Sequence, residues 1–303
     1  MVSLRSKIGD TARMNAEIAR QQFPYASAQI IVDGHVLRYV DEGAGDQTLL
    51  CVHGNPTWSF YYRKVIERFS ANHRVIAVDH LGCGRSDKPS LGEFDYRFAS
   101  HRDNLVRLVE TLDLSNVTLV AHDWGGAIGL ASLLKTRDRF SRIVLLNTGA
   151  FVPPFIPFRI SLCRIPVLGT IALRQFNLFA KAALTMAMSR NSLGQEAKEG
   201  LLAPYNSWGN RVAIDRFVKD IPMKESHPTY SELFNLGESL VSLANLPSLL
   251  IWGMQDWCFR PECLRRFQAA WPNAEVVEIP DAGHYVLEDA SEETLTAIDQ
   301  FLA

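Results

Sequence analysis

Short runs of β-branched and other apolar residues alternate along the chain with longer stretches in which apolar residues recur at helical spacing. This alternation is typical of a mainly parallel sheet wrapped by helices, an α/β fold. The eight predicted strands are 29–32, 36–41, 48–52, 74–78, 117–121, 143–146, 249–252 and 275–279. The predicted helices are 58–70, 98–112, 124–136, 230–243, 261–270 and 291–302. Asp33-Gly34 between the first two strands is a hairpin signal, so we expect the sheet to begin antiparallel and continue parallel.

The pattern breaks between residues 151 and 226. This segment has no convincing strand, contains prolines such as Pro153 and Pro166, and carries apolar residues at helical spacing with arginines between them. We interpret it as a helical cap inserted after the sixth strand, because a strandless segment of this length is more typical of a lid over a pocket than of peripheral packing. The core is then expected in two parts, 25–150 and 227–303.

Residues 1–24 predict a helical arm, because Leu4, Ile8, Met14 and Ile18 fall roughly on one helical face. Such a face should pack against something, usually its own core and less often a second subunit. A homo-oligomer formed through the arm or the cap therefore stays open as an alternative.

Composition excludes several classes of protein. The chain has 303 residues, 47% hydrophobic and 21% charged, and 31 basic against 33 acidic residues give a net charge of −2. This bulk balance is that of an ordinary soluble globular protein, without the basic excess of a nucleic-acid or membrane-surface binder. No uncharged apolar run approaches the roughly 18 residues that span a bilayer. The five cysteines are odd in number and lack metal spacing, which favours reduced thiols and a cytoplasmic location.

Neither a metal nor a nucleotide cofactor is indicated. Gly82-x-Gly84 lacks the third glycine of a dinucleotide-binding loop. His53, His80 and His122 follow predicted strands, but none is paired at helical spacing with a second type of ligand. We therefore interpret them as hydrogen-bonded structural histidines.

Residues 121–125, Ala-His-Asp-Trp-Gly, lie between a predicted strand and a predicted helix. A nucleophile elbow needs small residues two positions before and two after the reactive side chain, and Ala121 and Gly125 meet that need. Asp123 stands at the nucleophile position. A carboxylate nucleophile forms an ester with an alkyl carbon, which suits displacement of a leaving group from saturated carbon. Asp is also a favoured helix N-cap, and without partner residues that structural role would be the better interpretation.

Partners for Asp123 occur in the expected order, which in this kind of elbow is nucleophile, acid, histidine. Asp256 follows the seventh predicted strand, and His284 follows the eighth. The end of the sixth predicted strand offers Asn147 and no carboxylate. Asp281 is the rival acid, but it precedes His284 by only three residues and is better suited to shaping the turn. The predicted triad is Asp123, Asp256 and His284.

The loop His53-Gly54-Asn55-Pro56 directly follows the third strand. A backbone N–H of Asn55, together with that of Trp124, can form an oxyanion hole. The side-chain amide of Asn55 and the indole N–H of Trp124 are further hydrogen-bond donors, so they are suited to holding a leaving anion.

These motifs resemble the haloalkane dehalogenases of the α/β-hydrolase fold. The matching segments are His53 to Trp58, Asp79 to Pro89, His122 to Gly126, and Gly283-His284. The resemblance covers about residues 28–150 and 246–303, and the cap only loosely. Asn55 and Trp124, with the acid after the seventh strand, are similar to the third dehalogenase subfamily. That branch also contains β-lactone decarboxylases of bacterial long-chain olefin biosynthesis.

The resemblance implies a cofactor-free hydrolase. Asp123 would displace halide from a haloalkane while Asn55 and Trp124 hold the halide. His284, oriented by Asp256, would then activate the water that hydrolyses the Asp123 ester to release an alcohol. The expected partners are a small apolar halogenated or lactone substrate, water and halide.

Three alternatives stay open. The first is β-lactone decarboxylation in the same site. The second is epoxide hydrolysis with Tyr205 and Tyr230 as ring-opening acids, although such relatives usually carry an aromatic residue in place of Asn55. The third is a ligand-binding receptor without turnover, which should show a damaged triad. Five apolar residues could line a substrate cavity or pack inside the cap, namely Phe155, Phe158, Phe176, Phe179 and Met186.

Overall fold

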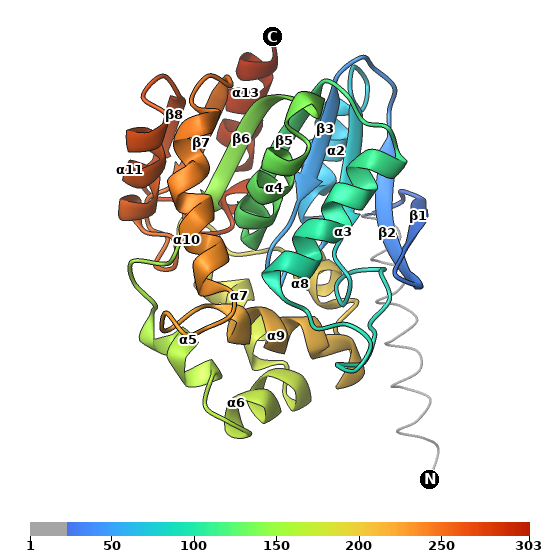
Figure 1. Cartoon of the computed structure of the whole chain (residues 1–303), viewed down its shortest axis with the longest axis vertical. Helices are drawn as coiled ribbons and strands as arrows, with labels where there is room; N and C mark the ends of the chain where they lie inside the picture. The colour runs from blue at the N-terminus through green and yellow to red at the C-terminus, as the bar shows by residue number, and fades with distance from the viewer. Residues whose placement is uncertain (1–22) are drawn as a thin grey trace.

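A computed structural model describes residues 23–303, so all but the last two residues of the predicted arm, 1–24, lie outside the described residues. The eight predicted strands all form, and they make one sheet in the order β1-β2-β4-β3-β5-β6-β7-β8 (Figure 1). Their bounds are β1 Ser27–Val32, β2 His35–Glu42, β3 Thr48–Val52, β4 Arg74–Asp79, β5 Val117–Asp123, β6 Phe140–Thr148, β7 Ser248–Gly253 and β8 Glu275–Ile279.

The sheet changes direction where the sequence predicts it. Asp33 and Gly34 have φ of 49° and 84°, the left-handed region that a two-residue hairpin turn requires. Strand β2 runs antiparallel to both of its neighbours, and every other pair of adjacent strands is parallel. The prediction that the sheet begins antiparallel and continues parallel is confirmed.

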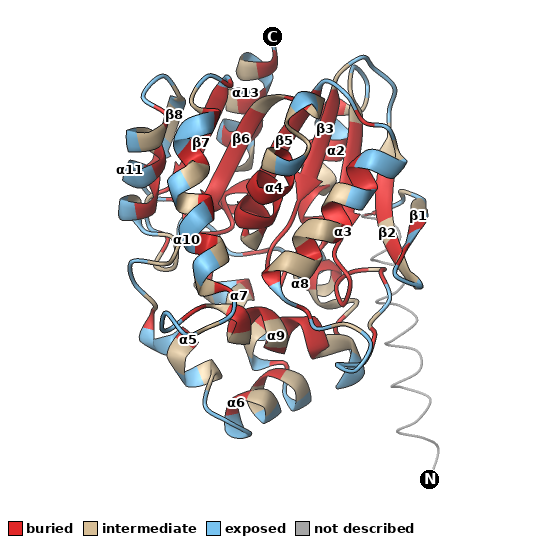
Figure 2. Ribbon diagram, in the orientation of Figure 1, coloured by how far each residue is buried: buried red, intermediate tan, exposed pale blue. Residues whose placement is uncertain are grey.

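Helices cover both faces of the sheet, and most of the strands are buried (Figure 2). The apolar strand residues divide between the two faces. In β3, Leu50 and Val52 pack toward one face while Leu49 and Cys51 pack toward the other. One face is covered by α3 Phe98–Thr111, α4 Trp124–Lys135, α10 Tyr230–Ser239, η5 Leu240–Leu243 and α11 Pro261–Ala270. The other is covered by η1 Ser59–Tyr62, α2 Arg63–Phe69, α12 Val286–Asp289 and α13 Ser291–Leu302. The short η2, Arg137–Arg139, precedes β6.

Residues 151–226, between β6 and β7, contain helices and no strand. The helices are α5 Phe158–Cys163, α6 Leu168–Thr170, η3 Ile171–Gln175, α7 Leu178–Met186, α8 Gln195–Leu202, η4 Gly209–Arg211 and α9 Val212–Asp220. Most of this insertion lies beyond the end of the sheet at which β6 finishes, at the bottom of Figure 1. No helix within residues 23–303 is both long and apolar enough to cross a bilayer.

Candidate active site

Asp123 occupies a strained turn between β5 and α4, with φ 55° and ψ −131°. A non-glycine residue adopts such a backbone only where its surroundings impose it, and such positions concentrate at functional sites. A Cβ at Gly125 would lie 1.9 Å from the carbonyl oxygen of Val52, so the turn closes against β3 only because residue 125 is glycine. The backbone therefore has the geometry that the elbow motif predicts.

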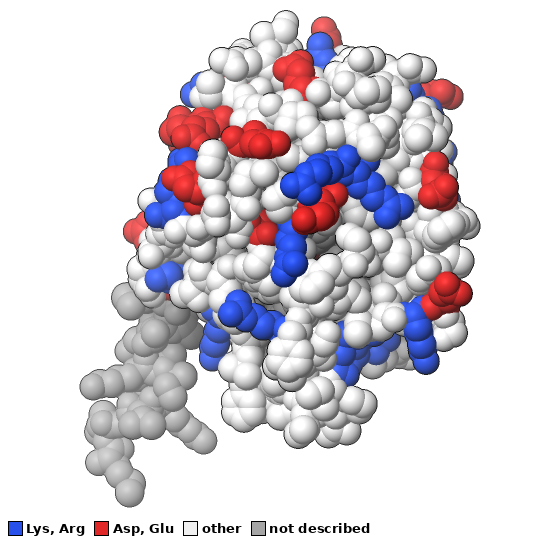
Figure 3. Space-filling view, turned by 90° about the vertical axis from the view of Figure 1, so that its left-hand side faces the viewer, with Lys and Arg blue, Asp and Glu red and all other residues white. Residues whose placement is uncertain are grey.

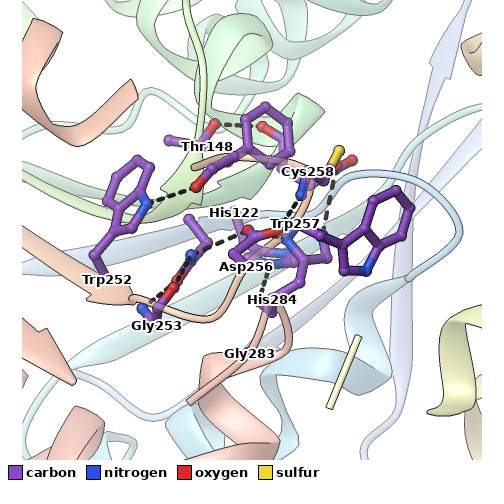
Figure 4. A network of polar contacts seen from close by, with 12 residues as sticks. His122, Thr148, Trp252, Gly253, Asp256, Trp257, Cys258, Gly283 and His284 are labelled. Atoms are coloured by element: carbon purple, nitrogen blue, oxygen red, sulfur yellow. Dashed lines mark hydrogen bonds and ion pairs between the residues drawn. The ribbon is translucent and has the colours of Figure 1, made fainter. Parts of the chain in front are cut away.

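Asp123, Asp256 and His284 lie together although they are far apart in the sequence (Figure 4 shows Asp256 and His284). The Nδ1 atom of His284 is 2.8 Å from Oδ2 of Asp256, and its Nε2 atom is 3.6 Å from Oδ2 of Asp123. All three side chains are buried. The first distance is a hydrogen bond that fixes the imidazole, and the second is longer than a hydrogen bond. His284 is thus oriented by Asp256 and directs its free nitrogen toward the Asp123 carboxylate.

The charges of the two carboxylates change the acidity of the imidazole. Burial by itself lowers the pKa of His284, but Asp256 and Asp123 raise it, and the pKa ends above its usual 6.5. Burial raises the pKa of Asp123, while His284 and the backbone N–H groups of Trp124 and Asn55 act in the opposite direction. Titration of His284 is therefore coupled to the charge of its two partners.

The loop after β3 brings hydrogen-bond donors to Asp123. The backbone N–H of Asn55 donates to Oδ1 of Asp123 at 2.6 Å. A Cβ at Gly54 would lie 1.9 Å from the same Oδ1 atom, so only glycine allows this approach. Nδ2 of Asn55 donates to the Ile214 carbonyl at 3.3 Å, which leaves the second hydrogen of that amide for another acceptor. Among the described residues the indole N–H of Trp124 meets no acceptor, and both side chains border a cavity.

Two positioning residues of Asp256 were not predicted. Nδ2 of Asn147 donates to Oδ2 of Asp256 at 3.0 Å, and the backbone N–H of Cys258 donates to Oδ1 at 2.7 Å (Cys258 in Figure 4). Asn147 also exchanges two hydrogen bonds with the backbone of Gly253. Asn147 lies near the end of β6, beside the end of β7 from which Asp256 follows. This position was the sequence feature that could have predicted its contact with Asp256.

Asp281, the rival acid, points away from the site. It pairs with Arg190, and 61% of its side chain is exposed. The carboxylate that holds the histidine loop is Asp289, which the sequence did not single out. Its Oδ2 atom accepts the backbone N–H groups of Gly283 and Ser189, both at 2.7 Å, so it ties the loop of His284 to the insertion.

The three histidines that follow predicted strands, His53, His80 and His122, are internal hydrogen-bonding groups. Nδ1 of His53 lies 2.8 Å from the Gly54 carbonyl, and its Nε2 accepts the backbone N–H of His80. Nε2 of His122 lies 2.9 Å from the carbonyl oxygen of His284. Burial lowers the pKa of His53 to about 3, and it also lowers the pKa of His80 and of His122. Within residues 23–303 no cluster of three or more His, Cys, Asp or Glu side chains could hold a metal ion.

Two largely apolar cavities of about 90 and 330 Å³ meet at Asp123. Both are lined by Asn55, Asp123, Ile160, Phe179 and Cys258. We call the smaller cavity the first arm and the larger cavity the second arm. The first arm is also lined by Trp124, Phe151, Phe155 and Leu233. The second arm is also lined by Leu162, Ala182, Met186 and His284. Asp123 thus lies at the junction of two apolar spaces.

The five apolar residues of the insertion that could line a substrate cavity fall into two groups. Phe155, Phe179 and Met186 line the arms, whereas Phe158 and Phe176 line neither and are exposed. Tyr205 and Tyr230, the two candidate acids for epoxide opening, also line neither arm. The hydroxyl of Tyr205 is bonded to the Thr57 carbonyl at 3.1 Å.

A family model described as the alpha/beta hydrolase fold matches residues 47–291. The chain belongs to this family. It is 40% identical over 274 residues to a cis-3-alkyl-4-alkyloxetan-2-one decarboxylase of Shewanella oneidensis, covering 89% of this chain and 86% of the relative. A decarboxylase with the same name from Xanthomonas campestris is 37% identical, covering 89% and 93%. Haloalkane dehalogenase 2 of Mycobacterium tuberculosis is 32% identical, covering 92% and 95%.

Solved structures of haloalkane dehalogenases share this architecture. DatA of Agrobacterium tumefaciens has a TM-score of 0.81 at 25% identity, covering 91% of this chain and 96% of that one. DpaA of Paraglaciecola agarilytica, described as tetrameric, has a TM-score of 0.75 at 29% identity and 92% coverage of both chains. The predicted α/β-hydrolase fold and the resemblance to the haloalkane dehalogenases are confirmed.

Proposed function

We propose that this α/β-hydrolase is a decarboxylase of cis-β-lactones that carry two alkyl chains. The observation that carries the proposal is the pair of apolar arms that meet at Asp123, because a 3,4-dialkyl lactone presents two chains that diverge from one reacting centre. Identity of 40% and 37% to two proteins named as such decarboxylases supports the same substrate class. The insertion 151–226 then serves as the cap that closes both arms over the ring.

The first step is a displacement at saturated carbon. One oxygen of Asp123 attacks the ring carbon that bears the lactone oxygen, and the bond between that carbon and oxygen breaks. The strained ring opens to a covalent ester of Asp123 that carries a free β-carboxylate. The side-chain donors of Asn55 and Trp124 hold this carboxylate as its charge develops, just as they would hold a departing halide.

The second step needs neither water nor an added proton. The carboxylate leaves as CO₂, the electrons of its carbon–carbon bond form the alkene, and the carbon–oxygen bond of the ester breaks to restore Asp123. The attack inverts the configuration of the ring carbon. In the fragmentation, the breaking carbon–carbon and carbon–oxygen bonds are anti-periplanar. The two events together convert a cis lactone to a cis alkene. Backbone donors at Asn55 and Trp124 stabilise the Asp123 carboxylate as it leaves.

Haloalkane hydrolysis is the second candidate, supported by 32% identity to haloalkane dehalogenase 2 and by the fold of the solved dehalogenases. The sequence alone ranks it first. The ranking changes because the two relatives with higher identity are decarboxylases and because a linear haloalkane fills only one arm. In this reaction the Asp123 ester has no β-carboxylate, so His284 must activate water to cleave it.

Narrowing one arm should reduce the tolerated length of the alkyl chain at only one of the two substituted carbons of the lactone ring. Leu233→Trp narrows the first arm and Ala182→Phe narrows the second, and neither residue belongs to the triad. We expect each variant to lose roughly tenfold or more in kcat/KM for only one of a pair of lactones, 3-octyl-4-methyl and 3-methyl-4-octyl. The measurement is alkene release by gas chromatography. Equal losses on both lactones in both variants would contradict the two-arm assignment.

Removing a donor should slow the displacement step. Trp124→Phe keeps most of the ring and deletes its N–H, so we expect a loss of roughly 10²–10³ in the single-turnover rate. Asn55→Asp should be worse than Asn55→Ala, because it sets a negative charge beside the departing anion. Melting temperatures of the variants separate this effect from packing. If Trp124→Phe alters the melting temperature and leaves the rate unchanged, the indole has only a structural role.

The pH dependence of bromoalkane hydrolysis should follow His284. Only neutral imidazole accepts a proton from water, so activity should rise with pH, with a midpoint that the neighbouring Asp256 shifts upward. Asp256 raises the pKa of His284 through its charge and hydrogen bond, so Asp256→Asn should lower that midpoint as well as the rate. Bromide release from 1-bromobutane across pH gives both quantities. An unchanged midpoint in Asp256→Asn would contradict this role of Asp256.

A further inference from the structure

The insertion exposes an unusual amount of apolar surface. Of fifteen large hydrophobic residues that are exposed within residues 23–303, nine lie between 155 and 178. The six most exposed of the nine are Phe158, Val167, Leu168, Phe176, Leu178 and Leu162, and we call this set the apolar cap face. They belong to α5, α6, α7 and the residues beside them; α5 contacts α6, and η3 contacts both α6 and α7. Contiguous exposed apolar surface of this kind marks an interaction site.

Charge is segregated around the same face. Residues 151–190 contain five basic residues, namely Arg159, Arg164, Arg174, Lys181 and Arg190, and no acidic residue. The whole chain carries −2, so removing these five positive charges leaves −7 on the rest. In Figure 3 the bottom of the molecule is white with blue side chains above it, and the red side chains lie higher. Arg190 is paired with Asp281 and Glu293, so Arg159, Arg164, Arg174 and Lys181 make up the local excess, which the net charge of the chain conceals.

The second arm opens on the apolar cap face. Leu162 and Leu178 line that arm and are also about half exposed, and the exposed Arg159 lines it with them. A molecule entering the arm therefore passes between apolar and basic side chains on the outer surface of the insertion.

We propose that the apolar cap face docks on an anionic phospholipid bilayer. Exposed apolar side chains flanked by Lys and Arg are the combination that holds a protein at a negatively charged lipid surface, through apolar insertion and electrostatic attraction together. The absence of carboxylates from residues 151–190 removes the repulsion that such a surface would otherwise exert. Docking places the mouth of the second arm against the lipid. Delivery of a dialkyl substrate from the bilayer rests on the proposed function, whereas docking itself does not.

Vesicle sedimentation of the purified full chain tests the docking. The vesicles are phosphatidylcholine alone, or phosphatidylcholine with about one-third phosphatidylglycerol. We expect binding to the second kind only, and loss of binding in about 0.5 M salt, where charges are screened. Arg159→Gln with Lys181→Gln should weaken binding by roughly 25-fold, because each cation near such a surface contributes about fivefold.

A triple variant tests the apolar part. Phe158→Ser, Val167→Ser and Leu168→Ser should reduce binding at least tenfold, since all three side chains are mostly exposed and line neither arm. The matched control is Ile31→Ser, Leu91→Ser and Val241→Ser, which removes three exposed apolar side chains elsewhere and should bind as the unmodified chain does.

Three results would overturn the proposal. The first is an unmodified chain that stays in the supernatant with anionic vesicles, and the second is equal binding by the two triple variants. The third is an oligomer that the Phe158, Val167 and Leu168 changes dissociate, with no vesicle binding by the unmodified chain, because the face would then be an interface between copies. Each readout measures binding rather than turnover, so failure of the proposed reaction leaves this test intact.

Discussion

Asp123→Asn should abolish turnover of both β-lactones and bromoalkanes, with a loss of at least about 10⁴ in kcat. Asparagine keeps the size of the side chain and an oxygen that can accept the 2.6 Å hydrogen bond from the backbone of Asn55. It removes the negative charge that attacks carbon, and a neutral amide oxygen is a poor nucleophile. Alkene release and bromide release measure the two losses separately.

A surface carboxylate serves as the control for this substitution. Asp281 precedes His284 by three residues, but its side chain is exposed and pairs with Arg190. Asp281→Asn should therefore keep activity within about twofold, as surface changes away from a site usually do. Residual activity above one-hundredth in Asp123→Asn would show that another group attacks the substrate.

His284→Phe should separate the two reactions. With 1-bromobutane we expect turnover to fall by at least about 10³, because the Asp123 ester is left without a base to activate water. The stalled ester should appear by mass spectrometry as one butyl group added to Asp123. With a cis-β-lactone the ester breaks down by losing CO₂, so alkene release should fall by roughly tenfold or less, and no stable adduct should accumulate.

The outcome of the His284→Phe experiment discriminates between two chemistries in one site. If lactone turnover falls as far as bromoalkane turnover, the decarboxylation also needs His284, and the water-free fragmentation is wrong. If 1-bromobutane leaves no adduct although the unmodified enzyme releases bromide, Asp123 does not form the ester. The lactone result thus tests only the loss of CO₂ from the Asp123 ester. The bromobutane result tests whether Asp123 is the nucleophile.

The sheet could be predicted because its signals are local. The apolar run of β3 is buried on both faces, and Asp33-Gly34 adopts the two left-handed conformations that its turn requires. The positions of Asp123, Asp256 and His284 could also be predicted, because each follows a strand and parallel strands end at the same edge of a sheet. Local pattern and chain order were sufficient for these features.

Other parts of the site depend on contacts between distant residues. Asn147 donates a hydrogen bond to Asp256, which is 109 positions away in the sequence. The residues around Asn147 contain no pattern that predicts this partner. Asp289 was missed for the same reason, since its carboxylate accepts N–H groups from Gly283 and from Ser189 in the insertion. The division of the insertion into residues that line the arms and residues that face outward also required the packing of its short helices.

One competition measurement tests the central proposal most directly. The purified enzyme is given a cis-β-lactone with two long alkyl chains, and separately 1-bromobutane, and kcat/KM is measured for alkene with CO₂ and for bromide. We expect the lactone to exceed the bromoalkane by at least about 10³, which is a difference of about 4 kcal/mol in transition-state stabilisation. Bromide release that matches or exceeds alkene release would contradict the account and make the enzyme a haloalkane dehalogenase.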